Sequence, residues 1–65
     1  MKNYGIMASV YERTFNGEIY QWKESLDYKK DAIRKKEYYK KKGYSVAITT
    51  QRHGRKFVYD IWVRK

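Results

Sequence analysis

The stretch of residues 27–43 constrains the fold more than any other part of the chain. Its lysines, arginine, glutamate and alanine are good helix formers, and it has no internal glycine or proline. It therefore predicts a single helix over residues 27–42. Gly43 can adopt the left-handed conformation that ends a helix, and Tyr44 would then pack back on Tyr39.

The start of this helix has two candidate caps, and its faces differ in chemistry. Asp27 is a suitable N-cap, and Ser25 is the competing one. At about 100° per residue, the apolar side chains form a narrow stripe made of Tyr28, Ala32 and Tyr39, with Ile33 on its flank. The opposite side of the predicted helix carries Lys30, Arg34 and Lys41.

The residues before the helix predict a β-hairpin. Residues 4–14 alternate in the manner of a strand, and Asn16-Gly17 suits a type I′ turn into a second strand over residues 18–23. A two-residue loop pairs Thr14 with Ile19. Both faces of this hairpin carry apolar residues, so the pattern leaves open which face meets the helix.

The residues after the helix predict a second hairpin, with strands over 44–50 and 55–64 and His53-Gly54 as the loop. In this register one face gathers six apolar residues, Tyr44, Val46, Ile48, Tyr59, Ile61 and Val63. The expected fold is a single α+β domain over residues 1–65. It has one antiparallel sheet in ββαββ order and one central helix packed on one face.

Positive charge is concentrated after the first hairpin. The formal net charge of the 65 residues is +9. Residues 1–26 hold three basic and three acidic side chains, whereas residues 27–42 hold eight basic and three acidic ones. Residues 43–65 add five basic side chains and one acidic one. This asymmetry indicates one basic side or end of the molecule, which is typical of proteins that bind nucleic acid.

Several classes of function find no support in the sequence. The chain has no cysteine, one histidine and no phosphate-cradling glycine loop. We therefore expect no catalytic site, no metal site, no cofactor and no small-molecule substrate. No apolar run is long enough to span a membrane, and the polar start MKNYG lacks a signal-peptide core. We therefore expect a cytoplasmic protein that does not bind membranes.

Basic residues interleaved with aromatic ones are the informative pattern. Lysine and arginine contact phosphates, while tryptophan can stack on bases. The predicted nucleic-acid-binding residues are Lys30, Arg34, Lys41, Arg52, His53, Arg55, Lys56 and Trp62. Alternation places Trp62 on the sheet side away from the helix. There a second copy, a nucleic acid, or a first-hairpin residue such as Trp22 or Tyr11 should cover it.

The sequence favours a non-catalytic protein that binds double-stranded DNA, ahead of RNA or single strands, with little dependence on base sequence. In size, charge and a tryptophan-bearing sheet it is similar to the small lysine-rich chromatin proteins of thermophilic archaea, which lack a long central helix. The alternative is a small protein-interaction module, such as a viral or mobile-element inhibitor or adaptor. Its uncovered sheet face would form a homodimer or bind an acidic partner.

Overall fold

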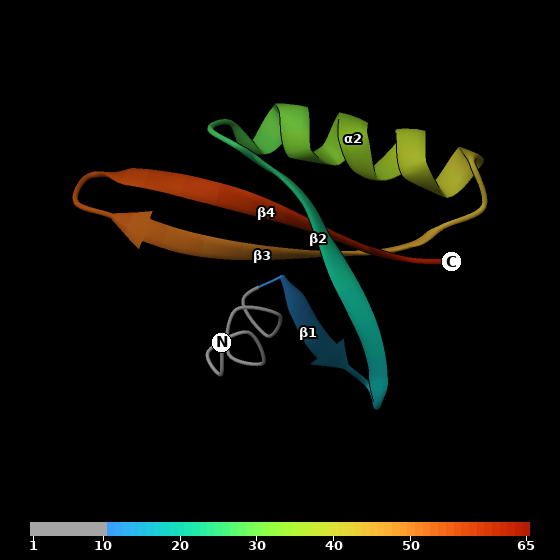
Figure 1. Ribbon diagram of the computed structural model, residues 1–65. Helices are drawn as coiled ribbons and strands as arrows, with labels where there is room; N and C mark the ends of the chain where they lie inside the picture. The colour runs from blue at the N-terminus through green and yellow to red at the C-terminus, as the bar shows by residue number, and fades with distance from the viewer. Residues whose placement is uncertain (1–10) are drawn as a thin grey trace, which may run out of the picture.

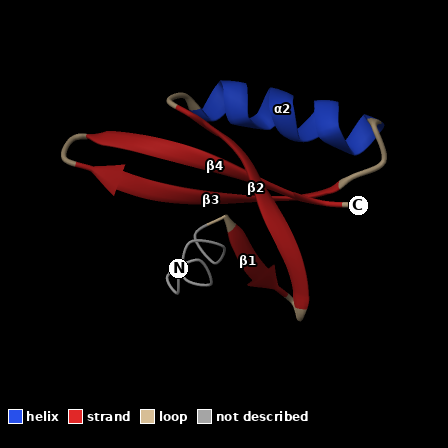
Figure 2. Cartoon of the chain, in the orientation of Figure 1, coloured by secondary structure: helices blue, strands red, loops and turns tan. Residues whose placement is uncertain are grey.

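The computed structural model describes residues 11–65, which form one antiparallel sheet of four strands and one helix packed against it. The predicted α+β fold in ββαββ order is therefore confirmed, as Figure 2 shows. Residues 1–10 contain most of the predicted first strand, and that part of the prediction lies outside the described residues. The elements are β1 (Glu12–Phe15), β2 (Glu18–Leu26), α2 (Lys29–Lys41), β3 (Ser45–His53) and β4 (Lys56–Arg64).

The strands lie in the order β1-β2-β4-β3, so β2 and β4 are central. In Figure 1, α2 lies along one side of β3 and β4, while β1 lies on the other side of them. β2 is the element that crosses between these two regions. The two sides of the β3–β4 hairpin are consequently covered by different elements.

Both hairpins turn at glycines, but only the first turns at the predicted residues. Asn16 and Gly17 have φ values of +53° and +81°, as a type I′ turn requires, and Thr14 pairs with Ile19. In the second hairpin the loop is Gly54-Arg55, because His53 pairs with Lys56.

The prediction of a His53-Gly54 loop is therefore wrong. The cause is the position of the glycine in the turn. Gly54 has a φ of +64°, and Arg55 does not have a positive φ, which matches the glycine-first pattern of a type II′ turn. The register moves by two residues, so Ile48 pairs with Ile61 rather than with Tyr59. A shift of two preserves the faces of the strands, and the predicted apolar set remains together.

The end of α2 agrees with the prediction and its start does not. Gly43 has a φ of +96°, and the Tyr44 N–H donates to the Tyr39 carbonyl oxygen at 3.1 Å, as in a Schellman motif. The N-cap is Tyr28, without a side-chain capping bond. Neither predicted cap is used, because Ser25 lies within β2 and Asp27 precedes the N-cap position by one residue.

The core lies between α2 and the sheet. Ala32 and Tyr39 are the buried residues of the helix, whereas Tyr28 and Ile33 are 69% and 49% exposed. The apolar stripe that α2 buries is thus narrower than the predicted one. The sheet contributes Ile61 and Val63 to the core, with Leu26, Tyr44, Val46, Ile48 and Tyr59 packed around them.

An irregularity in β2 decides which side chains face each side of the sheet. Trp22 pairs with Trp62, but Glu24 pairs with Ile61, so Lys23 is an extra residue, as in a β-bulge. A bulge reverses the alternation that follows it. Trp22 and Ser25, which are three residues apart, therefore lie on the same side of the sheet, and Glu24 lies on the helix side.

Candidate nucleic-acid interface

The outward side of α2 carries three basic residues and one acidic residue, Glu37, which is also exposed. Lys30, Arg34 and Lys41 are all exposed, and their spacing of four and seven residues keeps them within about 40° of one another around the helix. Ala32, two residues from both Lys30 and Arg34, is buried against the sheet. The predicted basic side of the helix is therefore confirmed as a solvent-facing row, which we call the basic helix face.

A second group of cations lies at the tip of the β3–β4 hairpin, which Figure 1 shows extending past the start of α2. Arg52, His53, Arg55 and Lys56 are all exposed, and we call them the hairpin tip. The Arg52 Nε donates to the Gly54 carbonyl oxygen at 2.9 Å, so this side chain is tied to its own turn.

The hairpin tip presents cations to both sides of the sheet. Arg52 pairs with Phe57, and His53 pairs with Lys56. Because side chains alternate along a strand, Arg52 lies on the helix side and His53 on the opposite side. The tip and the start of the basic helix face occupy the same end of the molecule, while Lys41 lies in the last turn of α2 at the other end. The predicted basic residues thus form two groups, the basic helix face and the hairpin tip, which approach each other only at the start of α2.

Trp62 does not belong to an exposed surface, and of the three predicted ways to cover it the structure shows the intramolecular one. It is only 4% exposed, and its indole N–H donates to the Thr49 hydroxyl at 2.8 Å. The Phe15 ring lies 6.2 Å from the Trp62 ring, and the Arg13 guanidinium lies 4.9 Å over it. The first hairpin covers Trp62, but through Phe15 and Arg13, residues the sequence pattern had not selected.

Exposed aromatic residues instead lie next to the cations. Phe57 is 48% exposed beside the hairpin tip, and Tyr38 is 48% exposed on α2. Lys35 and Lys42 place their ammonium groups 5.4 Å and 5.0 Å from the centre of the Tyr38 ring. The sequence prediction missed these two aromatics. The signal for Phe57 was strand alternation in the correct register, which places it opposite Arg52.

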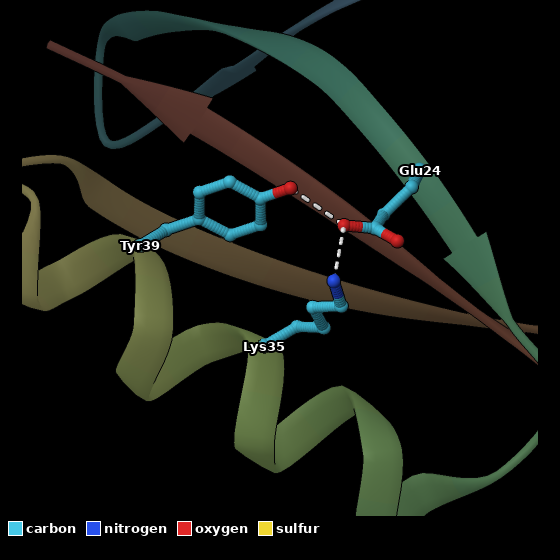
Figure 3. Close-up of polar contacts among 3 residues, drawn as sticks. All are labelled: Glu24, Lys35 and Tyr39. Carbon is cyan, nitrogen blue, oxygen red and sulfur yellow. Dashed lines mark hydrogen bonds and ion pairs between the residues drawn. The ribbon is translucent and has the colours of Figure 1, made fainter.

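A polar contact fixes the helix on the sheet, as Figure 3 shows. The Tyr39 hydroxyl donates to Glu24 Oε2 at 2.6 Å, and the Lys35 ammonium lies 3.7 Å from the same oxygen. Burial and the hydrogen bond to Glu24 raise the pKa of Tyr39 to about 12. The Tyr39 hydroxyl therefore stays protonated and keeps donating to Glu24, and this contact holds α2 with its basic side outward.

The side of the sheet away from α2 contains a polar network around Asp60, which is 4% exposed. Trp22 Nε1 donates to Asp60 Oδ1 at 3.2 Å, and Gln51 Nε2 donates to Oδ2 at 2.8 Å. The Ser25 hydroxyl also donates to Oδ1. The sequence prediction assigned no role to this network, because regular alternation puts Trp22 and Ser25 on opposite sides of the strand.

In the part of the chain that the structure describes, no helix is long and apolar enough to cross a membrane. Comparison of the chain with protein-family models, with curated proteins and with solved structures finds no match.

Proposed function

We propose that this protein binds nucleic acid without catalysis, and that it holds double-stranded DNA through phosphate contacts. The observation that carries the proposal is the outward basic row of Lys30, Arg34 and Lys41 on a helix fixed to the sheet by its other side. Lys30 and Arg34 make no ion pair with residues 11–65. Their charge is available to an anionic partner.

The mode of binding follows from the geometry of the two cation groups. Lys30 and Lys41 are eleven residues apart, which is about 16 Å along a helix. Duplex DNA presents one phosphate charge per about 1.7 Å of its axis, so a row of this length can follow a backbone. Phosphate contacts of this kind carry no sequence information, and the expected binding is largely independent of sequence.

The alternative function, a protein-interaction module, relied on an open apolar sheet face. Trp62, the main residue of that face, is covered by Phe15 and Arg13. Trp62 itself therefore gives that alternative no open surface, and we propose nucleic-acid binding.

The test is the affinity for a random-sequence DNA duplex at several salt concentrations. We expect a dissociation constant in the micromolar range or weaker at physiological salt, and a steep loss of affinity as salt increases. Replacing Arg52 and Arg55 together by alanine should reduce the slope of log affinity against log salt by about two units.

The matched control is the charge-conserving pair Arg52→Lys and Arg55→Lys, which should keep the slope because counterion release depends on charge. A slope near zero for the unmodified protein would show that phosphate contacts do not drive binding, and the proposal would be wrong.

A further inference from the structure

A hollow of about 410 Å³ lies on the side of the sheet away from α2, between the start of β1 and the middle of β4. Trp22 and Tyr11 form part of its wall, and Gln51 and Asp60 contribute polar groups. None of its lining residues belongs to α2, which packs on the other side of the sheet, so the hollow is separate from the basic helix face. Aromatic walls with a few convergent polar groups are typical of a binding site for a small ring.

Two side chains in the wall of this hollow are held by hydrogen bonds. Trp22 and Gln51 both donate to the buried Asp60 carboxylate, from β2 and β3 respectively. These bonds cross the sheet and hold the two side chains in fixed orientations. A side chain locked by a hydrogen bond loses little further entropy when a ligand binds, and such preorganisation favours affinity.

The aromatic surface in the hollow remains accessible. Trp22 is 36% exposed and Tyr11 is 53% exposed, although the Trp22 N–H is already satisfied. Their rings are 5.8 Å apart and tilted by 58°, so Tyr11 does not lie flat on the Trp22 ring. Part of the Trp22 side chain is therefore open to contact by a ligand.

The polar groups present both donors and acceptors. Arg13 is held over Trp62 and makes no ion pair with residues 11–65, so its guanidinium offers donors. Gln51 uses its amide nitrogen on Asp60, and its carbonyl oxygen is an acceptor. Glu12 and Asp60 also line the hollow, and with one arginine their two negative charges disfavour a phosphate there.

We propose that this hollow binds an unpaired nucleobase, which stacks on Trp22 and forms hydrogen bonds with Gln51 and Arg13. The inference rests on the proposed function and adds single-stranded segments to its ligands. The hairpin tip supplies the neighbouring phosphate contact. His53 lies two residues from Gln51 on the same side of β3, which is about 7 Å along a strand.

The first test uses a nucleoside, which has a base and no phosphate. Adenosine is titrated into the complete protein, and the indole N–H resonance of Trp22 is followed by NMR. We expect a saturable shift that weakens several-fold in Gln51→Ala. The matched control is Thr50→Ala, an adjacent exposed residue on the helix side of β3, which should leave the titration unchanged. Thermal melting of both variants verifies that they remain folded.

The second test compares a single-stranded oligonucleotide with the same sugar–phosphate chain lacking its bases. Base stacking should make the complete oligonucleotide bind about five- to a hundred-fold more tightly. Equal affinity for the two chains would overturn the base site while leaving phosphate binding intact.

The variant Lys30→Ala with Arg34→Ala separates the two proposals. It should weaken binding of the oligonucleotide and keep the adenosine shift at Trp22. Absence of a saturable adenosine shift in the unmodified protein overturns the base site, whether or not DNA binds. A clear adenosine shift with no binding of any DNA supports the base site and makes the proposed function wrong.

Discussion

Asp60 and Ile61 are neighbours in β4 with nearly equal burial and opposite surroundings. They are 4% and 0% exposed. Ile61 faces α2 and belongs to an apolar core, whereas Asp60 faces the other way and accepts three side-chain hydrogen bonds. One side of this sheet is stabilised mainly by removal of apolar surface from water. The other depends on a buried charge whose acceptors are satisfied.

The difference between the two sides originates in the bulge at Lys23. After this residue the alternation of β2 is reversed, which brings Ser25 to Asp60 and Glu24 to Tyr39. One extra residue in β2 thus supplies a polar contact to each side of the sheet. Ser25 thus contacts Asp60 in the wall of the proposed base site, and Glu24 contacts the helix of the proposed phosphate site.

The largest effect on stability is expected from a substitution in the apolar core between α2 and the sheet. Ile61→Ala should lower the free energy of unfolding by about 2–5 kcal/mol, because it removes three carbons from a fully buried position and leaves a cavity. A domain of this size seldom has more than about 3–5 kcal/mol of stability from its core. We therefore expect a largely unfolded variant, which circular dichroism in increasing urea would measure.

The control for that variant is the same substitution at Ile33, which is 49% exposed on α2. Ile33→Ala should change the free energy of unfolding by less than about 0.5 kcal/mol. Similar losses at both positions would contradict the assignment of Ile61 to the core.

A smaller effect on stability is expected from substitutions of Asp60 in the polar network on the other side of the sheet. Asp60→Ala leaves the Trp22, Ser25 and Gln51 donors without their acceptor and should cost about 2–3 kcal/mol. Asp60→Asn keeps one oxygen for Trp22 and Ser25, and Gln51 can turn its carbonyl oxygen toward the new amide. That variant should cost about 1 kcal/mol, as measured by urea unfolding.

The matched control is Asp27→Ala, which removes a carboxylate that is exposed and does not cap α2. Its effect should stay within about 0.5 kcal/mol. If Asp60→Asn destabilises as much as Asp60→Ala, the negative charge itself is required, and an account based on acceptors alone is wrong.

The apolar side was largely predictable from the sequence because its signals are local. Asn16-Gly17 and Gly43 specify their turn and helix end through backbone conformation, and the β4 residues Tyr59, Ile61 and Val63 lie on one face through alternation. A register error of two residues in the second hairpin did not disturb these faces. The row of Lys30, Arg34 and Lys41 followed from helical spacing in the same way.

The polar side was not predictable because it depends on an irregularity and on tertiary contacts. The amino-acid sequence around Lys23 does not indicate a bulge, and regular alternation would place Trp22 and Ser25 on opposite sides of the strand. The cover on Trp62 comes from Phe15 and Arg13 on β1, which approach it only when β2 crosses from β1 to β4. Neither candidate caps the helix, because Ser25 lies within β2 and the helix begins two residues after Asp27.

The smallest effect is expected at Tyr39, where one polar contact holds the apolar side together. Tyr39→Phe removes the hydrogen bond to Glu24 and should cost about 1 kcal/mol near neutral pH. The folded-state pKa of about 12 lies above the ordinary tyrosine value of 10.0, so folding favours the protonated hydroxyl. This part of the stability is fully present below pH 10 and is lost as the pH rises through 12. Urea unfolding at several pH values should therefore show the free energies of unfolding of wild type and Tyr39→Phe converging over that range.

The control is Tyr38→Phe at a half-exposed neighbour, whose free energy of unfolding should show no such convergence with wild type. A constant difference in free energy between Tyr39→Phe and wild type would mean that the hydroxyl proton is not what Glu24 holds.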